Sequence, residues 1–216
     1  VVAKRQTGGR GRYGRKFVSD EGGMWLSAVV PTPGGPQAWV GYALAVGWAL
    51  LCYLRNIGGG LPTARLRWPN DILVEERKLA GILLEQPNER ECIVGIGLNV
   101  RNDLTCAEGD LARTAIRLAD CIAPQILPSL EELVEGTLDA IRYSWERFSM
   151  GGLAGLKDEI NGCWGRMRRV RLELADGKVV EGVMVGIDEV GAILVSGDEG
   201  TDSYAAHKVK QLFEVE

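Results

Sequence analysis

Glycine and arginine alternate near the start of the chain, in the stretch Gly8-Gly9-Arg10-Gly11-Arg12-Tyr13-Gly14-Arg15. Because glycine adopts backbone conformations that other residues avoid, successive N–H groups of such a loop can converge on an anion. Arginine adds planar, bidentate donors that suit phosphate and carboxylate groups. The stretch predicts an anion-binding loop, and the alternative is a flexible basic arm of the kind that contacts RNA.

A second polar group follows, where Arg67-Trp68-Pro69-Asn70-Asp71 precedes Arg77-Lys78-Leu79-Ala80-Gly81. Pro69 favours an extended Trp68, and the Asn-Asp pair after it favours a tight turn. Lys78 heads an otherwise apolar strand, which is unusual because a buried ammonium group needs a partner. Lys78 is therefore a candidate anion ligand, although its position alone slightly favours a hairpin-edge lysine that points to water.

The third group is Gly95-Ile96-Gly97-Leu98-Asn99. Side chains alternate along a strand, so Gly95, Gly97 and Asn99 are expected to share one face. Two absent side chains would leave a flat strip on which a ligand can lie against backbone. A bulge, or tight packing against a helix, explains the glycines equally well.

The elements that must position these groups follow from hydrophobic patterns. Pro36 suits a first helical turn, glycines 58–60 end that helix, and Ser129 with Glu132 forms a capping box. The expected strands are Met24–Val30, Arg65–Trp68, Ile72–Glu75, Lys78–Gln86 and Cys92–Val100, and the expected helices are Pro36–Asn56, Asp110–Cys121 and Ser129–Phe148.

After about Asn161 the sequence pattern changes, and it predicts short strands of alternating polarity joined by tight turns. These strands are Arg168–Leu174, Val179–Ile187, Ala192–Ser196, Asp202–Ala205 and Val209–Val215. Such a run of short strands predicts a small β-barrel. We therefore place a boundary near Gly162 and divide the chain into domains 1–161 and 162–216.

Composition argues against several classes of protein. The net charge of −4 gives no overall basic field that would attract nucleic acid or an anionic membrane. A single histidine, His207, and five cysteines without a CxxC pair argue against a zinc site, a Ser-His-Asp triad and a disulfide framework. They predict a reducing, cytoplasmic setting. Prolines divide the uncharged run 22–54 into a strand and a slightly short helix, so we expect a core element and no membrane span.

Four segments in this order resemble the signature segments of biotin protein ligases: GRGRYGR, RWPND, RKLAGILLE and GIGLN. The resemblance covers nearly the whole chain, because the C-terminal strands are similar to the family's SH3-like domain. It implies an α+β fold. A mixed β-sheet with packed helices, the class II synthetase-like catalytic fold of biotin and lipoate ligases, would be followed by a small SH3-like β-barrel.

The resemblance also implies a reaction and a set of residues. Such enzymes use ATP with Mg²⁺ to convert biotin into biotinyl-5′-AMP, and they transfer biotin to a lysine of biotin carboxyl carrier protein, a subunit of acetyl-CoA or pyruvate carboxylase. Biotin would contact Gln6, Arg10, Gly11, Arg12, Lys78, Gly81, Gly95 and Gly97. ATP or the adenylate would contact Arg12, Arg15, Phe17, Asn70, Asp71 and Asn99. The catalytic residues would be Lys78, Arg12 and Asp71, and Asp71 is also the candidate Mg²⁺ ligand.

The chain departs from the family's pattern in places. Phe17 stands where an adenine-stacking tryptophan is usual, and His207-Lys208 stands where glycine and an acidic residue are usual. The Ser/Thr-rich segment that holds the ureido ring of biotin is expected upstream of Val1, and because no initiator Met is present, we expect that an N-terminal segment is missing. No helix-turn-helix is visible, so DNA binding is not expected. Whether the protein forms a homodimer stays open.

Two other functions compete with this prediction. A lipoate-protein ligase shares the catalytic fold and the adenylate chemistry. A non-enzymatic RNA-binding module would use the arginine–glycine arm, yet the chain outside that arm is acidic, and the other two groups would then have no role.

Overall fold

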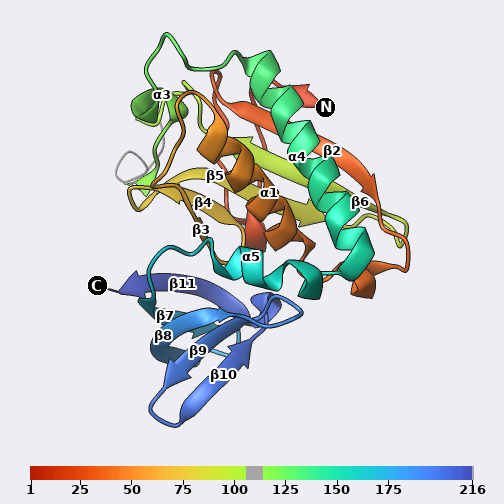
Figure 1. Ribbon diagram of the computed structural model, residues 1–216, viewed down its shortest axis with the longest axis vertical. Coiled ribbons are helices and arrows are strands. Elements are labelled where there is room, and N and C mark those ends of the chain that lie inside the picture. Colours follow the sequence, from red (N-terminus) through yellow and green to blue (C-terminus); the bar gives the residue numbers. More distant parts are fainter. Residues whose placement is uncertain (106–113, 216) are drawn as a thin grey trace.

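The computed structural model describes residues 1–105 and 114–215, which form two antiparallel sheets and the helices that cover them (Figure 1). The strands are β1 (Val2–Ala3), β2 (Met24–Pro31), β3 (Arg65–Arg67), β4 (Asp71–Val74), β5 (Arg77–Glu85), β6 (Glu91–Leu98), β7 (Arg168–Leu174), β8 (Val179–Ile187), β9 (Ile193–Gly197), β10 (Gly200–Tyr204) and β11 (Val209–Val215). The α-helices are α1 (Tyr42–Asn56), α3 (Leu118–Cys121), α4 (Leu130–Gly151) and α5 (Lys157–Asn161). Short 3-10 helices are η1 (Arg12–Gly14), η2 (Pro36–Trp39), η3 (Ala154–Leu156) and η4 (Ala206–Lys208).

The first sheet has the strand order β1-β2-β6-β5-β4-β3, and each of these strands pairs antiparallel with its neighbours. An isolated parallel bridge joins Lys78 to Ala115 and makes the pairing mixed. Burial alternates along β6, so that Cys92, Val94, Ile96 and Leu98 face the core. The α+β prediction is confirmed.

Helices α1 and α4 lie together across one face of this sheet (Figure 1). The side chains of α1 are buried nearly all round because the helix packs between the sheet and α4. The apolar stretch Pro36–Asn56 is long enough to cross a membrane, but more than half of it is buried inside the protein. It therefore behaves as a core element, as the sequence predicted.

The predicted continuous helix from Pro36 to Asn56 is wrong at Val40 and Gly41, which separate η2 from α1. Gly41 has a φ of 84°, a left-handed conformation that favours glycine. A Cβ atom there would lie 2.6 Å from Leu153 Cδ2 and 3.2 Å from the carbonyl oxygen of Val190. The break lets the chain pass close to η3 and to the turn between β8 and β9.

Helix α4 begins where its sequence predicts. Ser129 Oγ accepts a hydrogen bond from the Glu132 N–H at 3.2 Å, and Glu132 Oε2 accepts one from the Ser129 N–H at 2.8 Å. This capping box satisfies backbone donors that the first helical turn leaves unpaired.

The predicted continuous helix Asp110–Cys121 is wrong at residues 115–117, which are not helical, and residues 110–113 lie outside the described residues. Helix α3 covers only Leu118–Cys121, because the preceding backbone pairs with the sheet. The N–H of Ile116 donates to the carbonyl oxygen of Lys78 at 3.0 Å, and that of Leu118 donates to the carbonyl oxygen of Asn99 at 2.9 Å. These contacts replace the helical hydrogen bonds that the apolar spacing favoured.

The second sheet has the order β10-β9-β8-β7-β11, and all five predicted strands are present. In the described part of the chain no pairing joins β10 to β11, so closure of this sheet into a barrel stays a prediction. The boundary near Gly162 falls between α5 and β7 and also stays a prediction.

The cysteines that the structure describes are free thiols. Burial raises the pKa of Cys92 to about 11. A thiol with a raised pKa carries little thiolate and is inert, which agrees with the prediction of small buried hydrophobes.

We expect Gly41→Ala to lower the free energy of unfolding by about 2 kcal/mol or more, because alanine would meet both a left-handed backbone and a close contact with Leu153. Gly151→Ala is the matched control, since its Cβ would meet nothing within 4 Å. Urea unfolding of both variants measures the difference. Equal stability of the two variants would contradict the account of the Gly41 break.

Candidate functional site

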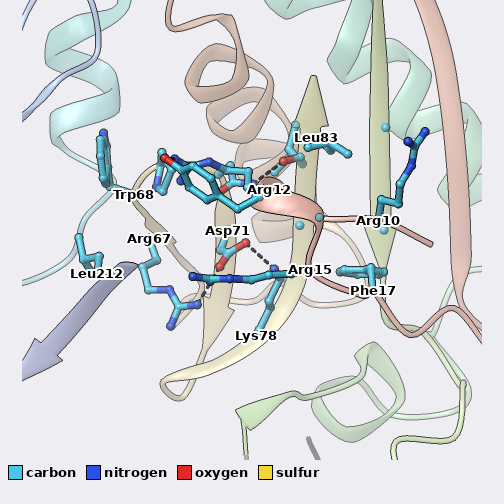
Figure 2. Close-up of a pocket in the computed structure, with 18 of the residues that line it drawn as sticks. Arg10, Arg12, Arg15, Phe17, Arg67, Trp68, Asp71, Lys78, Leu83 and Leu212 are labelled. Atoms are coloured by element: carbon cyan, nitrogen blue, oxygen red, sulfur yellow. Dashed lines mark hydrogen bonds and ion pairs between the residues drawn. The ribbon is translucent and has the colours of Figure 1, made fainter. Parts of the chain in front are cut away.

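A cavity of about 810 Å³ opens between the glycine–arginine loop, the first sheet and β11 (Figure 2). It lies on the face of the sheet away from α1 and α4, where the missing side chains of Gly95 and Gly97 make room. The predicted site residues that line it are Gln6, Arg10, Gly11, Arg12, Arg15, Phe17, Asn70, Asp71, Lys78, Gly81, Gly95 and Gly97. Asn99 is the predicted site residue that does not line it.

A β-bulge turns Lys78 toward the cavity. Asp71 pairs with Gly81 and Ile72 with Ala80, but Leu73 then pairs with Lys78, so Leu79 is the extra residue. Strict alternation would have placed Lys78 with the core-facing Ala80; the bulge instead sends Leu79 into the core, where it is fully buried. Lys78 is thereby placed on the same face as Asp71, and the alternative of a lysine that merely points to water is not what the structure shows.

Asp71 holds two cations in place. Its Oδ1 lies 2.6 Å from the Lys78 ammonium, and its Oδ2 accepts a hydrogen bond from Arg67 Nη2 at 2.7 Å (Figure 2). Burial alone would raise the pKa of Asp71, but attraction by Lys78 and Arg67 outweighs it and keeps the pKa below its ordinary value. The carboxylate is therefore ionised, and it aims the lysine at the cavity.

This arrangement does not fit Asp71 as a magnesium ligand. Both carboxylate oxygens already face cations, and Mg²⁺ binding there would have to displace Lys78 and Arg67. In the described part of the chain no group of three or more His, Cys, Asp or Glu side chains could hold a metal ion.

The ring of Phe17 lies on the glycine strip. A Cβ atom on Gly97 would lie 2.5 Å from Phe17 Cε1, and one on Gly81 would lie 3.4 Å from Phe17 Cε2. The ring contacts Trp25 edge-to-face with centroids 5.9 Å apart, and the Lys78 ammonium lies 5.4 Å from its centroid. The strip predicted from the glycines is present, but an aromatic side chain of the loop occupies it.

Two arginines of the loop, Arg12 and Arg15, contact the C-terminal part of the chain. Arg12 Nη2 donates to the carbonyl oxygen of Ala206 in η4 at 2.6 Å, and Arg15 Nη2 donates to that of Lys210 in β11 at 2.9 Å. The Tyr13 hydroxyl lies 3.0 to 3.2 Å from carbonyl oxygens of residues 206, 207 and 209. Burial lowers the pKa of Arg12. Arg10 differs, because its Nη2 lies 3.3 Å from Glu85 Oε1 of the first sheet.

The predicted amide residues have different roles. Asn70 Nδ2 donates to the carbonyl oxygen of Ile82 at 2.6 Å and ties its turn to β5. Gln6 Oε1 accepts from Ser19 Oγ at 2.7 Å beside the loop. Asn99 is buried, and its Nδ2 donates to the carbonyl oxygen of Lys78 at 3.2 Å. In this geometry Asn99 supports the backbone of Lys78 and does not reach a ligand in the cavity.

The sequence prediction missed several cavity residues. Arg67 was quoted within its segment but given no role, although the turn predicted after it brings it opposite Asp71, with which it pairs across β3 and β4. Arg166, Arg168 and Gln211 come from the C-terminal sheet. No local pattern marks them, because only the docking of the two sheets brings them to the cavity.

Comparisons with known proteins agree with this geometry. Two family models match the chain. The model described as "Biotin/lipoate A/B protein ligase family" matches residues 1–100, and the model described as "Biotin protein ligase C terminal domain" matches residues 168–211. The chain is 31% identical over 211 residues to the biotin--[acetyl-CoA-carboxylase] ligase of Mycobacterium tuberculosis, a match that covers 89% of this chain and 71% of that protein. The chain belongs to the biotin protein ligase family.

Other biotin protein ligases are similar over most of the chain. It is 30% identical over 213 residues to the bifunctional ligase/repressor BirA of Escherichia coli (strain K12), covering 91% of this chain but only 61% of BirA. A solved structure of biotin protein ligase from Aquifex aeolicus in complex with biotin and ATP superposes with a TM-score of 0.84 at 28% identity, covering 99% of this chain and 88% of that one. The chain thus spans about three fifths of the BirA proteins and most of the Aquifex structure.

We expect Asp71→Asn to lower the free energy of unfolding at pH 7 by about 3–5 kcal/mol, because two cations would lose their buried counter-ion. The pKa of Asp71 is lowered in the folded protein, so its contribution is complete above the ordinary aspartate pKa of about 3.9 and is lost as the pH falls through the lowered value. Unfolding measured from pH 7 to pH 2 should show the two proteins converge in acid. Asp139→Asn removes an exposed carboxylate and should change stability by less than about 0.5 kcal/mol.

We expect Tyr13→Phe to loosen the glycine–arginine loop, because the variant keeps the ring and loses the hydroxyl that contacts three carbonyl groups. Trypsin cleavage after the loop arginines, followed by mass spectrometry, should become several-fold faster. Tyr143→Phe alters a similarly exposed tyrosine on α4 and should leave the loop unchanged. Unchanged cleavage in Tyr13→Phe would show that the hydroxyl does not hold the loop.

Proposed function

We propose that this protein is a biotin protein ligase, which activates biotin with ATP to biotinyl-5′-AMP and transfers biotin to a lysine of biotin carboxyl carrier protein. The observation that carries the proposal is the position of Lys78, aimed by Asp71 over a strip of glycines and beside arginines of a glycine-rich loop. Family membership and the similarity to a ligase structure that contains biotin and ATP support it.

In the first half-reaction a carboxylate oxygen of biotin attacks the α-phosphorus of ATP, and pyrophosphate leaves. Lys78 holds the carboxylate, and Arg12 and Arg67 offset the negative charge that the two reactants bring together. Each charge-assisted contact contributes about 1.5–3 kcal/mol. Asp71 takes no part in bond formation in this proposal; it orients Lys78. Mg²⁺ accompanies ATP as part of the nucleotide substrate.

In the second half-reaction the lysine amine of the carrier attacks the carbonyl carbon of the adenylate, and AMP leaves. The glycine-rich loop then serves to keep water away from the adenylate. Because Phe17 lies on Gly97 and Arg12 binds a carbonyl group of the C-terminal sheet, biotin and nucleotide must displace these contacts as they bind. Binding is therefore coupled to movement of the loop.

The partners follow from this reaction: biotin, ATP and a carrier subunit of acetyl-CoA or pyruvate carboxylase. Four points remain predictions from the sequence. They are adenine stacking on Phe17, a cytoplasmic setting, the absence of DNA binding and a possible homodimer.

The competing functions have less support. A lipoate-protein ligase would share the first family description, but the match of residues 168–211 is to a domain named for biotin protein ligases. An RNA-binding arm needs free arginines, whereas Arg12 and Arg15 are bound to backbone carbonyl groups.

The experiment that tests the proposal measures pyrophosphate release from ATP in the presence of biotin, lipoate or neither. Release that depends on biotin, followed by biotin transfer to a purified carrier domain, is the expected result. Release with lipoate alone would replace the proposal with a lipoate ligase, and release with neither substrate would refute both. Salt-sensitive RNA binding without pyrophosphate release would favour the competing function of an RNA-binding module.

We expect Lys78→Ala to lower the rate of biotin-dependent pyrophosphate release by about 10- to 150-fold, because the variant loses the cation that contacts the carboxylate. The fold should persist, since Lys78 lies at the cavity surface with its side chain 30% exposed. Lys178→Ala, in the turn between β7 and β8, is the control and should retain the parent rate. A normal rate in Lys78→Ala would remove Lys78 from the mechanism.

A further inference from the structure

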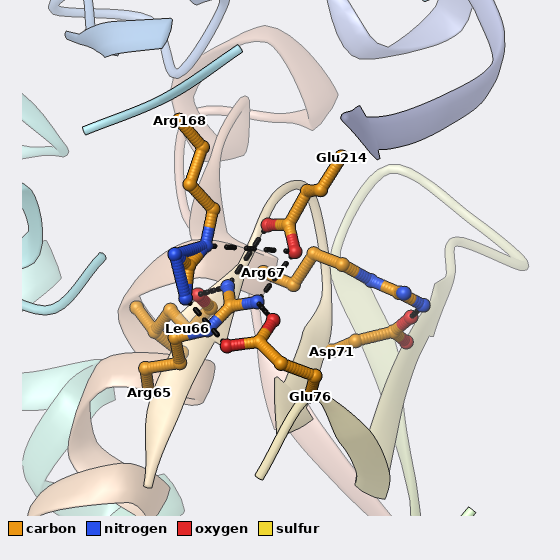
Figure 3. A network of polar contacts seen from close by, with 7 residues as sticks. All are labelled: Arg65, Leu66, Arg67, Asp71, Glu76, Arg168 and Glu214. Carbon is orange, nitrogen blue, oxygen red and sulfur yellow. Dashed lines mark hydrogen bonds and ion pairs between the residues drawn. The ribbon is translucent and has the colours of Figure 1, made fainter. Parts of the chain in front are cut away.

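The hairpin that carries Asp71 and Lys78 is held at its tip by arginines from both sheets (Figure 3). Glu76 forms the tip of the β4–β5 turn, and its carboxylate accepts a hydrogen bond from Arg65 of β3. It also accepts one from Arg168 of β7 at 2.6 Å. The turn that precedes the proposed carboxylate-binding lysine is therefore fixed by the C-terminal sheet as well as by its own.

A fourth charge completes this ion cluster of Arg65, Glu76, Arg168 and Glu214. Arg65 Nη1 donates to Glu214 Oε1 of β11 at 2.9 Å, and Arg168 Nε lies 3.6 Å from Glu214 Oε2. The side chains of Arg65, Arg168 and Glu214 are 7%, 12% and 19% exposed, whereas that of Glu76 is 59% exposed. The two cations therefore lie largely out of water and Glu76 reaches them from the surface, so removal of its carboxylate leaves two poorly solvated cations with Glu214 as their remaining counter-ion in the cluster.

The neighbouring Glu75 provides an internal comparison. Glu75 and Glu76 both have a positive φ, 49° and 64°, as the two-residue turn requires. Glu75 is 66% exposed and pairs with Arg77 of the same hairpin. Among the described residues, Glu76 forms ion pairs with other elements and Glu75 pairs within the hairpin, so Glu75 is a matched control of the same charge in the same turn.

The backbone at Lys78 is held from the opposite side. Its carbonyl oxygen accepts hydrogen bonds from Asn99 Nδ2 at 3.2 Å and from the N–H of Ile116 at 3.0 Å. The hairpin therefore has two supports, Asn99 with Ile116 at the start of β5 and the ion cluster at the tip. Loss of the tip support would let the bulge that turns Lys78 toward Asp71 relax.

We propose that Glu76 is a positioning residue for Lys78, and that Arg168 couples the docking of the C-terminal sheet to the carboxylate-binding end of the cavity. Glu76 and Arg168 border the same cavity as Lys78. The expected effect on biotin rests on the proposed function, whereas the expected effect on Lys78 itself does not.

The first test needs no ligand. Amine acetylation of the folded protein, followed by peptide mass spectrometry, reports how strongly Asp71 holds the Lys78 ammonium. We expect Glu76→Gln to raise the labelling rate of Lys78 several-fold relative to Lys178 in the same protein, and Glu75→Gln to leave it unchanged. An unchanged rate in Glu76→Gln would overturn the proposal.

The second test compares biotin with biotinol, the alcohol that lacks the carboxylate. We expect Glu76→Gln to weaken biotin binding about tenfold and to leave biotinol binding within about twofold, because only the carboxylate meets Lys78. An equal loss for both ligands would mean that the cluster is merely structural, and would overturn the proposal. If the parent protein binds neither ligand while Lys78 labelling still responds to Glu76→Gln, the proposed function fails and the positioning role stands.

Arg168→Gln tests whether the C-terminal sheet acts on Lys78 through Glu76. Its effects on labelling and on biotin affinity should match those of Glu76→Gln, and the double variant should be no worse than either single variant. Independent, multiplying effects would refute the coupling through Glu76. If Glu76→Gln fails to fold in a thermal unfolding assay, Arg168→Gln and Arg168→Lys carry the same labelling comparison, because Glu76 then retains Arg65.

Discussion

The site depends on one buried carboxylate that holds two cations. An ammonium group at a partly buried position is costly unless an opposite charge accompanies it. Asp71 supplies that charge to Lys78 and to Arg67, and the β-bulge at Leu79 places the lysine where Asp71 can reach it. The bulge costs one regular pair of the sheet, and the ion pair compensates for it. Without this arrangement the glycines would still leave a flat surface at the base of the cavity, but no cation would be oriented toward it.

The C-terminal sheet completes the site with backbone oxygens. Carbonyl groups of Ala206 and Lys210 accept hydrogen bonds from Arg12 and Arg15. A phosphate or carboxylate offers a full negative charge, so it can compete for the same guanidinium groups. The backbone carbonyl groups thus keep the loop beside the cavity. When an anion binds, the guanidinium groups would exchange these carbonyl oxygens for the oxygens of the anion. In the proposed function this exchange gives the C-terminal sheet a role in binding, although most of its strands lie away from the cavity.

Local sequence patterns correctly predicted the features that neighbouring residues determine. Helix α4 begins at its capping box, and strands β7, β8 and β11 have the predicted bounds, because alternation and turn residues determine them. The resemblance to biotin protein ligases, and not a local pattern, predicted that the glycine strip, the loop and Lys78 share one site, and one cavity contains them.

The errors arose where long-range contacts decide the structure. Ile116 pairs with β5 and cannot continue a helix, and Gly41 interrupts a helix because another segment passes close to it. Asn99 does not line the cavity with Gly95 and Gly97, because it is buried and its amide donates to the backbone of Lys78. The bulge at Leu79 has no signal in the alternation of the sequence, since strict alternation would have buried the lysine.

Phe17 shows how one residue links these parts. Its ring covers the backbone of Gly81 and Gly97, which these two glycines would otherwise leave open to water. Phe17 is also the last residue of the loop, where its N–H donates to the carbonyl oxygen of Gly9 at 2.9 Å. A ligand that lies on the strip must lift the ring, and lifting the ring moves the loop that carries Arg12. Occupation of the floor and rearrangement of the arginines are therefore one event, because the same short segment carries both.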